Sequence, residues 1–204
     1  MTTVPQNSFC EEHKIVITGI GGQGIVFLTR LLSQTAVNLG YPVVVSETHG
    51  MSQRGGSVIS HLKIGGNEAP LIQRGSADVL IALDANEAMQ NLDFVRRGGT
   101  VFVSSNEELH PDLLPHLERL NIRTLHFPAS AIAVELGSPE TANIVMAGFV
   151  CAYDGLNLPL EDLQATIKQI AGKRAEGNLK ALAAGFQAGK KKIEDAQPLP
   201  ENSR

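Results

Sequence analysis

Residues 48–57, THGMSQRGGS, bring a basic side chain, an imidazole and three glycines together in one short polar segment. Arg54 carries a planar fork of donors that matches carboxylate or phosphate geometry, and His49 can titrate near neutral pH. Gly50, Gly55 and Gly56 permit backbone conformations that other residues rarely adopt, so the segment can fold tightly against another group.

This segment directly follows an apolar run that ends at Glu47. Ligands bind at the carboxyl ends of the strands in open α/β sheets, so the position of the segment predicts a site. We expect seven residues to bind a ligand or face an active site: Glu47, His49, Gly50, Gln53, Arg54, Gly55 and Gly56.

Simpler interpretations of the same stretch stay open. Arg54 pairing with Glu47 in a solvated segment needs no ligand, and Met51, an apolar side chain among polar ones, suits a flexible interface. His61 lies on a predicted strand, where we expect a packed, hydrogen-bonded role rather than a catalytic one.

A second glycine pattern precedes this segment. Gly19, Gly21 and Gly24 fit GxGxxG between an apolar run and a helical stretch, and Glu47 lies 23 residues beyond Gly24, near the usual place of a ribose-binding acid. Such glycines allow a tight turn and place N–H groups at a helix start, where phosphate binds. The candidate set here is Gly19, Gly21, Gly22, Gln23 and Gly24.

The same glycines also suit close helix–strand packing and a turn that touches a neighbouring subunit, so that alternative stays open. Gln23 departs from the apolar pattern, and it either bonds a ligand or caps the helix.

The elements that must position these residues alternate along the first two thirds of the chain. Strands are expected at 14–18, 43–46, 57–64, 77–83, 100–103 and 122–127, and helices at 22–39, 85–95 and 111–120, with Asp84 as a helix cap. From 129 onward the pattern is helical, over 129–136, 141–153, 160–170 and 178–193. The sequence predicts an α/β, Rossmann-like fold: a mostly parallel sheet with helices on both faces and a helical C-terminal third.

We expect one domain over 13–193, a flexible N-terminal arm over 1–12 and a disordered tail over 194–204. In the last helix, Leu179, Leu182, Ala183, Phe186 and Ile193 form an apolar stripe. This stripe is either core or a partner-docking face.

Composition excludes several classes. A net charge of −4 without a block of like charges disfavours nucleic acid. No apolar run approaches the roughly 20 residues that span a bilayer, and no leader precedes the first strand, so the cytoplasm is the expected location. Cys10 and Cys151 are too few for a cluster that needs about four thiolates, so no metal site is expected.

The two segments also carry a family resemblance. GIGGQGIVFLTRLLSQTA (19–36) and SETHGMSQRGGSVISHLKIG (46–65) resemble the gamma-type domain of 2-oxoacid:ferredoxin oxidoreductases, specifically the small subunit of the indolepyruvate type. The resemblance continues through TANIVMAG (141–148) and EGNLKALAAGFQAG (176–189), and it spans about residues 14–190.

The resemblance implies a subunit that shapes the active site of a larger partner and is not active alone. The partners would carry thiamine diphosphate, Mg²⁺ and 4Fe-4S clusters, and the complex would convert a 2-oxoacid and coenzyme A to acyl-CoA, CO₂ and reduced ferredoxin. This chain lacks the thiamine signature, which is GDG followed by an asparagine pair. Tyr153-Asp154-Gly155 has tyrosine in place of the first glycine, and no asparagine pair follows. Coenzyme A is a possible ligand of the two glycine segments.

Two other classes of protein remain as alternatives: a free-standing NAD(P)-binding dehydrogenase and a nucleotide-binding module without chemistry. An aryl pyruvate is the first expectation for the substrate, with branched-chain and arylglyoxylate substrates open. The sequence does not specify the stoichiometry of the complex, the terminal electron acceptor or the ligand of either glycine segment.

Overall fold

The computed structural model describes residues 12–49, 55–65, 69–153, 156 and 158–196. The chain divides into two compact units, Met1–Pro128 and Ala129–Arg204. Most of the predicted N-terminal arm and residues 197–204 of the predicted tail lie outside the described residues.

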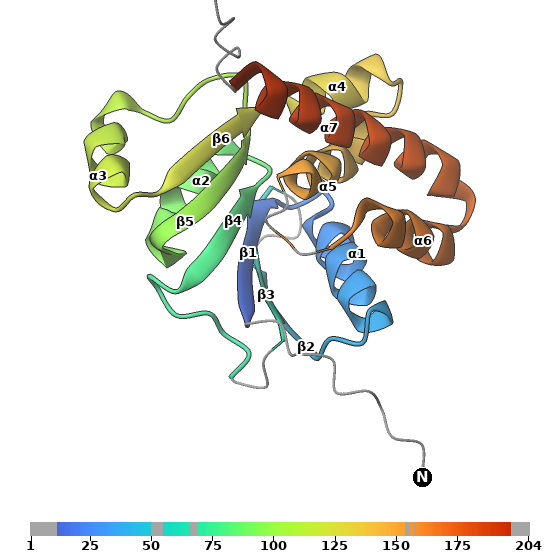
Figure 1. Cartoon of the computed structure of the whole chain (residues 1–204), viewed down its shortest axis with the longest axis horizontal. Coiled ribbons are helices and arrows are strands. Elements are labelled where there is room, and N and C mark those ends of the chain that lie inside the picture. Colours follow the sequence, from blue (N-terminus) through green and yellow to red (C-terminus); the bar gives the residue numbers. More distant parts are fainter. Residues whose placement is uncertain (1–11, 50–54, 66–68, 154–155, 157, 197–204) are drawn as a thin grey trace, which may run out of the picture. The chain divides into compact units, whose positions relative to one another are not determined.

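The first unit holds a six-stranded mixed sheet and the helices connected to it (Figure 1). All six predicted strands are present. The elements are β1 (His13–Ile20), α1 (Ile25–Asn38), β2 (Val43–His49), β3 (Ser57–Ile64), β4 (Ala77–Ala82), α2 (Ala85–Asn91), η1 (Leu92–Phe94), β5 (Val95–Ser104), η2 (Pro111–Leu113), α3 (Leu114–Arg119) and β6 (Arg123–Phe127).

The sheet order is β2-β3-β1-β4-β5-β6. Strands β1, β4, β5 and β6 pair in parallel, as predicted, while β3 runs antiparallel to both β1 and β2. Strand β3 therefore separates β1 from β2, which are neighbours in a simple βαβ unit. The chain returns along β3 from the end of β2, so the start of β3 lies beside the end of β1: Ser57 is the register partner of Ile20.

Helices cover both faces of β1, as the fold class predicted. Val16 packs in a core cluster with Leu80, Val101 and Ala88 of α2. Successive strand residues point to opposite faces, and Ile17 is likewise fully buried. Helix α1 contacts β1, β2 and β3 while α2 contacts β1, β4 and β5, and Figure 1 shows the two helices on different sides of the sheet.

Two element boundaries, the end of α2 and the start of β5, differ from the prediction. The helix expected over 85–95 ends at Asn91, and β5 begins at Val95 rather than at 100. Val95 pairs with Ala77, and the register then shifts so that Val79 pairs with Thr100. Gly98, at φ 72°, lies in this irregular stretch, so the glycine pair bends a strand that the prediction had interrupted.

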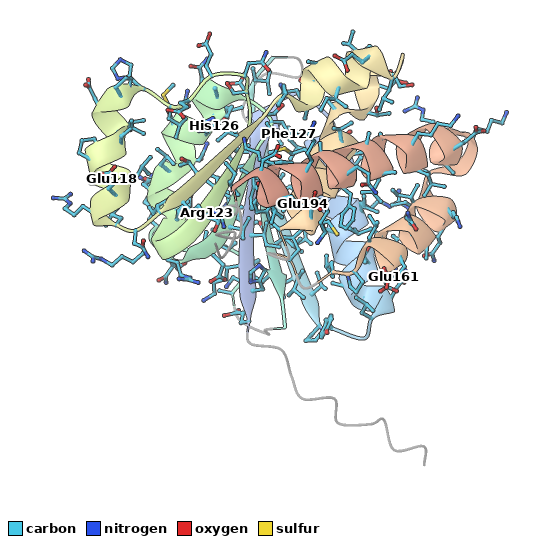
Figure 2. The ribbon with its side chains drawn as sticks, turned by 45° about the horizontal axis from the view of Figure 1, so that its top comes forward. Glu118, Arg123, His126, Phe127, Glu161 and Glu194 are labelled. Atoms are coloured by element: carbon cyan, nitrogen blue, oxygen red, sulfur yellow. The ribbon has the colours of Figure 1, made fainter. Side chains whose placement is uncertain are left out.

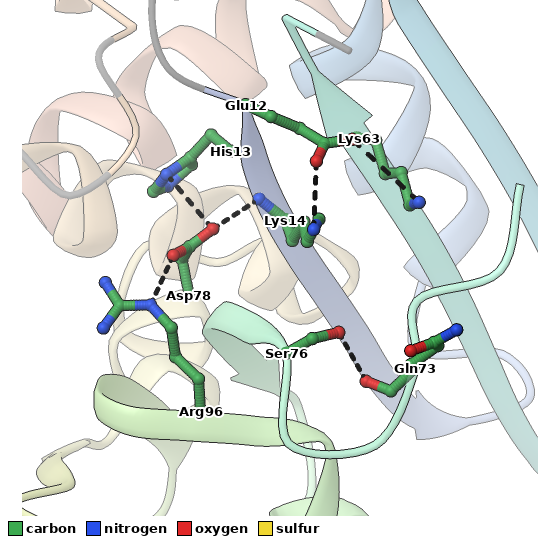
Figure 3. Close-up of polar contacts among 8 residues, drawn as sticks. All are labelled: Glu12, His13, Lys14, Lys63, Gln73, Ser76, Asp78 and Arg96. Carbon is green, nitrogen blue, oxygen red and sulfur yellow. Dashed lines mark hydrogen bonds and ion pairs between the residues drawn. The ribbon is translucent and has the colours of Figure 1, made fainter. Parts of the chain in front are cut away.

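Charged side chains tie the amino ends of β1 and β4 together (Figure 3). The Asp78 carboxylate accepts from the Lys14 N–H at 2.7 Å and from Arg96 Nε at 2.6 Å, while Glu12 pairs with Lys14 Nζ at 3.0 Å. These contacts fix the amino ends of the parallel strands. The glycine turn lies at the opposite end, where the carboxyl ends of these strands are.

His61 has the packed role that its strand position predicted. It is 4% exposed, its Nδ1 accepts from the Ile72 N–H at 3.4 Å, and its ring meets Phe94 edge-on. Burial lowers the pKa of His61, and the neighbouring Lys63 lowers it further. The imidazole is therefore neutral near pH 7 and belongs to the core.

Strand β6 is the edge strand of the sheet at the end away from β2. Figure 2 labels Arg123, His126 and Phe127 along it, with Glu118 on the preceding helix α3. Arg123, at the start of the strand, is exposed, while Leu125 and Phe127 on the same face are buried and contribute to the core.

The second unit is helical, as predicted. Its elements are α4 (Ala129–Glu135), η3 (Pro139–Thr141), α5 (Ala142–Ala152), α6 (Leu160–Ile170), η4 (Gly172–Arg174) and α7 (Ala175–Ala196). Glu161 lies in the first turn of α6, and Glu194 lies near the end of α7 (Figure 2). Helix α7 continues to Ala196, inside the segment expected to be disordered.

Helices α5 and α7 cross with their backbones in close contact. A Cβ added to Gly185 of α7 would lie 1.8 Å from the Val145 carbonyl oxygen of α5, and one added to Gly148 of α5 would lie 2.1 Å from the Leu182 carbonyl oxygen of α7. The sequence runs 141–148 and 176–189, which carry part of the family resemblance, therefore meet at one crossing that only glycine permits. From the apolar stripe predicted in the last helix, Leu182 is fully buried, which supports the core interpretation for that residue.

We predict that Gly185→Ala lowers the free energy of unfolding by about 2–4 kcal/mol, because the new methyl group overlaps the α5 backbone. The matched control is Gly177→Ala in the same helix, where an added Cβ meets nothing within 4 Å. Gly177→Ala should raise stability by about 0.5–1 kcal/mol, since alanine is the better helix former. Urea denaturation of the full chain measures both values, and equal effects would contradict the crossing.

Candidate functional site

The glycine turn between β1 and α1 is closed by its own backbone and by Gln23. Gly22 and Gly24 have φ values of 104° and 79°, which other residues rarely adopt. The Gln23 N–H donates to the Ile20 carbonyl at 3.1 Å, and the Gln23 side-chain oxygen accepts from the Ile20 N–H at 2.7 Å. The turn is thus rigidly built before any ligand is considered.

Gln23 also ties the turn to the neighbouring strand. Its side-chain nitrogen donates to the Leu83 carbonyl at 3.2 Å, just beyond β4. A Cβ on Gly19 would lie 2.6 Å from the Gln23 side-chain oxygen, so Gly19 makes room for this bridge. Both polar ends of the Gln23 amide bond within the chain, and the helix cap itself is Gly24, without a side-chain hydrogen bond.

The structure brings the two predicted glycine segments together. The Gly21 N–H donates to the Gly56 carbonyl at 2.8 Å, and a Cβ on Gly21 would stand 3.6 Å from the Gly55 nitrogen. Gly55 has a φ of 85°, so it also needs glycine. The end of the second segment therefore rests on the first.

Other members of the predicted set are placed only in part. Gly50, Gln53 and Arg54 lie outside the described residues, as does Met51, and for His49 the structure describes the backbone alone, at the end of β2.

Glu47 does not occupy the position of a ribose-binding acid. It is exposed near the end of β2, in register with Ser60 of β3. Because β3 intervenes, β2 lies two strand spacings, about 9–10 Å, from β1. In the usual dinucleotide site the acid follows the strand adjacent to β1, so the sequence spacing matched that fingerprint while the strand order does not.

What remains for a ligand at this edge is the start of α1. The N-cap residue of α1 is Gly24, which has no side chain to cap the helix, and the first-turn N–H groups form the positive end of the helix dipole. Gly22 is exposed beside it. Since the Ile20, Gly21 and Gln23 N–H groups are already bonded within the chain, the turn does not present a full pyrophosphate cradle.

A buried polar cluster beneath the two segments escaped the sequence analysis. Glu87, in the first turn of α2, is 6% exposed, and its carboxylate accepts from the Ser57 hydroxyl at 2.6 Å and the Thr18 hydroxyl at 3.2 Å. Asn91 donates to Thr18 Oγ1 at 3.2 Å. The available signal was Asp84-x-x-Glu87, a helix-start pattern whose acid normally turns back to the cap. Asp84 does cap α2, as predicted, but Glu87 reaches the sheet instead.

A separate groove of about 610 Å³ lies between α2, η1 and α3, with Met89, Leu113 and Leu117 among its lining residues. It contains none of the predicted site residues. Within the described ranges no group of three or more His, Cys, Asp or Glu could hold a metal ion, and no helix there is long and apolar enough to cross a membrane.

Fold and site together define a Rossmann-like subunit whose two glycine segments meet at the carboxyl edge of a mixed sheet. Residues 14–188 match the family described as pyruvate ferredoxin/flavodoxin oxidoreductase, and the chain belongs to that family.

Named relatives agree with this assignment. The chain is 34% identical to indolepyruvate oxidoreductase subunit IorB of Pyrococcus horikoshii, covering 90% of this chain and 98% of the relative. It is 33% identical to the subunit of the same name from Archaeoglobus fulgidus, covering 84% and 92%. The gamma subunit of a keto/oxoacid ferredoxin oxidoreductase from Geobacter sulfurreducens superposes with a TM-score of 0.70 at 25% identity, covering 87% of this chain and 98% of that one. The predicted membership among the small subunits of 2-oxoacid:ferredoxin oxidoreductases is confirmed.

We predict that Gln23→Ala lowers the free energy of unfolding by about 1–3 kcal/mol, because it leaves the Ile20 N–H and the Leu83 carbonyl without their partner. Gln90→Ala, at an exposed position of α2, is the matched control and should stay within about 0.5 kcal/mol of the wild type. Urea denaturation tests both. If the two variants were equally stable, Gln23 would not be the structural bridge, and its role as a ligand residue would gain support.

Proposed function

We propose that this chain is the small subunit of a thiamine diphosphate-dependent 2-oxoacid oxidoreductase, in which it shapes the active site of a larger partner subunit. The observation that carries the proposal is the Gly21–Gly56 hydrogen bond, which joins two glycine segments into one surface at the ligand-binding edge of the sheet. Family membership supplies the class of reaction.

The reaction in this proposal is the oxidative decarboxylation of a 2-oxoacid. The bond between the carboxylate and the carbonyl carbon breaks to release CO₂, the acyl carbon forms a thioester bond with the coenzyme A sulfur, which loses its proton, and the two electrons pass to ferredoxin or another acceptor. We place thiamine diphosphate, Mg²⁺ and 4Fe-4S clusters in the partner subunits. The part of this chain is to bind and orient ligands at the entrance of the partner's active site. The proposed location of the complex is the cytoplasm.

Coenzyme A is the ligand that this edge suits best. Its phosphates are anionic, and the uncapped start of α1 offers N–H groups and a positive dipole end. Arg54, which directly precedes Gly55 in the sequence, adds a guanidinium that matches phosphate geometry. An aryl pyruvate is the proposed 2-oxoacid, supported by the indolepyruvate names of the relatives at 33% and 34% identity.

The alternative, a free-standing NAD(P)-binding dehydrogenase, has less support. Its fingerprint needs free N–H groups in the glycine turn and an acid beside β1. The Gly21 N–H is bonded to Gly56, and Glu47 stands beyond β3.

We predict that the tagged chain, expressed in its native host, co-purifies with a larger subunit that contains thiamine diphosphate. Removing the chain from that complex should lower 2-oxoacid- and coenzyme A-dependent dye reduction by at least about tenfold, and adding it back should restore the rate. A chain that elutes alone and transfers hydride from NADH to a 2-oxoacid would overturn the proposal.

A second prediction concerns Arg54. In the reconstituted complex, Arg54→Ala should lower kcat/KM for coenzyme A by about 10–100-fold, the value of a charge-assisted hydrogen bond, with assembly intact. Arg174→Ala, which removes an exposed arginine from η4, serves as the charge-matched control and should leave the constant unchanged. Should Arg54→Ala prevent assembly instead, Arg54 is an interface residue.

A further inference from the structure

Glu87 is a buried carboxylate whose position the proposed chemistry does not explain. It is 6% exposed and lies one turn into α2, behind the Asp84 cap. Its Oε2 atom accepts from the Ser57 hydroxyl at 2.6 Å and from the Thr18 hydroxyl at 3.2 Å. The ion pairs found among the described residues do not include Glu87. In that part of the chain its carboxyl group is instead hydrogen-bonded to hydroxyl groups.

The two hydroxyls lie at special places in the chain. Thr18 directly precedes Gly19, where the first glycine segment begins, and Ser57 directly follows Gly56, where the second ends. One carboxylate oxygen therefore joins the bases of both segments. The Gly21–Gly56 hydrogen bond also joins the two segments, through their backbones.

The network also orients its own members. Asn91, one turn after Glu87 on α2, donates to Thr18 Oγ1 at 3.2 Å and to the Glu87 carbonyl at 2.8 Å. Thr18 Oγ1 lies 3.3 Å from the Val58 carbonyl as well, but a hydroxyl has one proton to donate. Asn91 donates to the Thr18 oxygen, and Thr18 shares its one proton between the Glu87 carboxyl oxygen on α2 at 3.2 Å and the Val58 carbonyl on β3 at 3.3 Å.

The Glu87 carboxyl group is buried, and its Oε2 atom makes a 2.6 Å hydrogen bond with the Ser57 hydroxyl. Burying a polar group costs free energy that an apolar side chain of similar volume would not. General stabilisation of the sheet therefore does not account for a carboxyl group at this position. Its contacts do, because one oxygen atom binds the hydroxyl groups of both Thr18 and Ser57.

We propose that Glu87 is a positioning residue, which holds the first glycine segment and the described end of the second, Gly55–Ser57, in a single geometry and thereby sets the affinity of the assembled complex for coenzyme A. This step rests on the proposed function for its ligand, but the positioning itself is a property of the isolated chain. Glu87 reaches no reacting atom in this account and acts only through Thr18 and Ser57.

The first test uses the isolated full-length chain and needs no ligand. Glu87→Gln removes the charge and keeps the shape, and Ser57→Ala removes the shorter hydrogen bond while leaving Glu87 in place. Both should speed hydrogen exchange at the Gly21 N–H by at least about tenfold, the ratio expected when about 1.4 kcal/mol of local stability is lost. Exchange in α5 and α7 should stay unchanged.

Glu118→Gln is the matched control, because it makes the same charge change at an exposed position of α3 (Figure 2). It should leave the Gly21 exchange rate at the wild-type value. If Glu87→Gln and Ser57→Ala also left that rate unchanged, the positioning role would be overturned.

The second test measures coenzyme A kinetics of the assembled complex. Each variant should raise KM for coenzyme A several-fold with kcat near the wild-type value, and the double variant should add little to Ser57→Ala alone, because both substitutions act on the Glu87–Ser57 contact. A fall in thermal stability with an unchanged KM would show a merely structural residue and contradict the proposal. If the wild-type chain does not support activity of the partner, the proposed function fails, while the exchange rates still decide whether Glu87 holds the two segments.

Discussion

The hydrogen bond from the Gly21 N–H to the Gly56 carbonyl is the contact on which the arrangement of the candidate site depends. It exists because β3 runs antiparallel between β1 and β2, which returns the chain after β2 to the end of β1. Bonding the turn to Gly56 removes one N–H from the set that a dinucleotide pyrophosphate would use. The glycine turn resembles the start of a cofactor-binding domain, but in this strand order it supports the second glycine segment.

A second constraint operates in the helical unit and is independent of the first. Helices α5 and α7 approach so closely that Gly148 and Gly185 have no room for a side chain. Both glycines belong to the sequence runs that extended the family resemblance into the C-terminal third, and this packing gives the two glycines a structural role. The residues that we propose to face a ligand belong to the first unit.

Much of the fold follows from local pattern. Buried β-branched runs such as 77–82 and the period of 160–170 identify their elements because each pattern fits one period only. The antiparallel insertion of β3 does not follow, because SVISHLKI pairs equally well in either direction until its neighbours are known. That single uncertainty misplaced Glu47, whose distance along the sequence was right for a ribose acid while its strand was not adjacent to β1.

The candidate site was predicted in outline and missed in its support. Gly21, Gly55 and Gly56 were named from their types and spacing, and the structure brings them together. Glu87 lies 30 residues from Ser57 and 69 from Thr18, and no periodic pattern connects positions so far apart. Its role depends on the strand order, so only the folded chain reveals it.

An experimental structure of the assembled complex with coenzyme A bound would test the proposed role of this edge most directly. We expect the phosphates of coenzyme A or the partner's active-site entrance to contact the edge formed by Gly22, the start of α1 and Gly55–Gly56. A complex in which this edge faces solvent, with coenzyme A bound elsewhere, would contradict it.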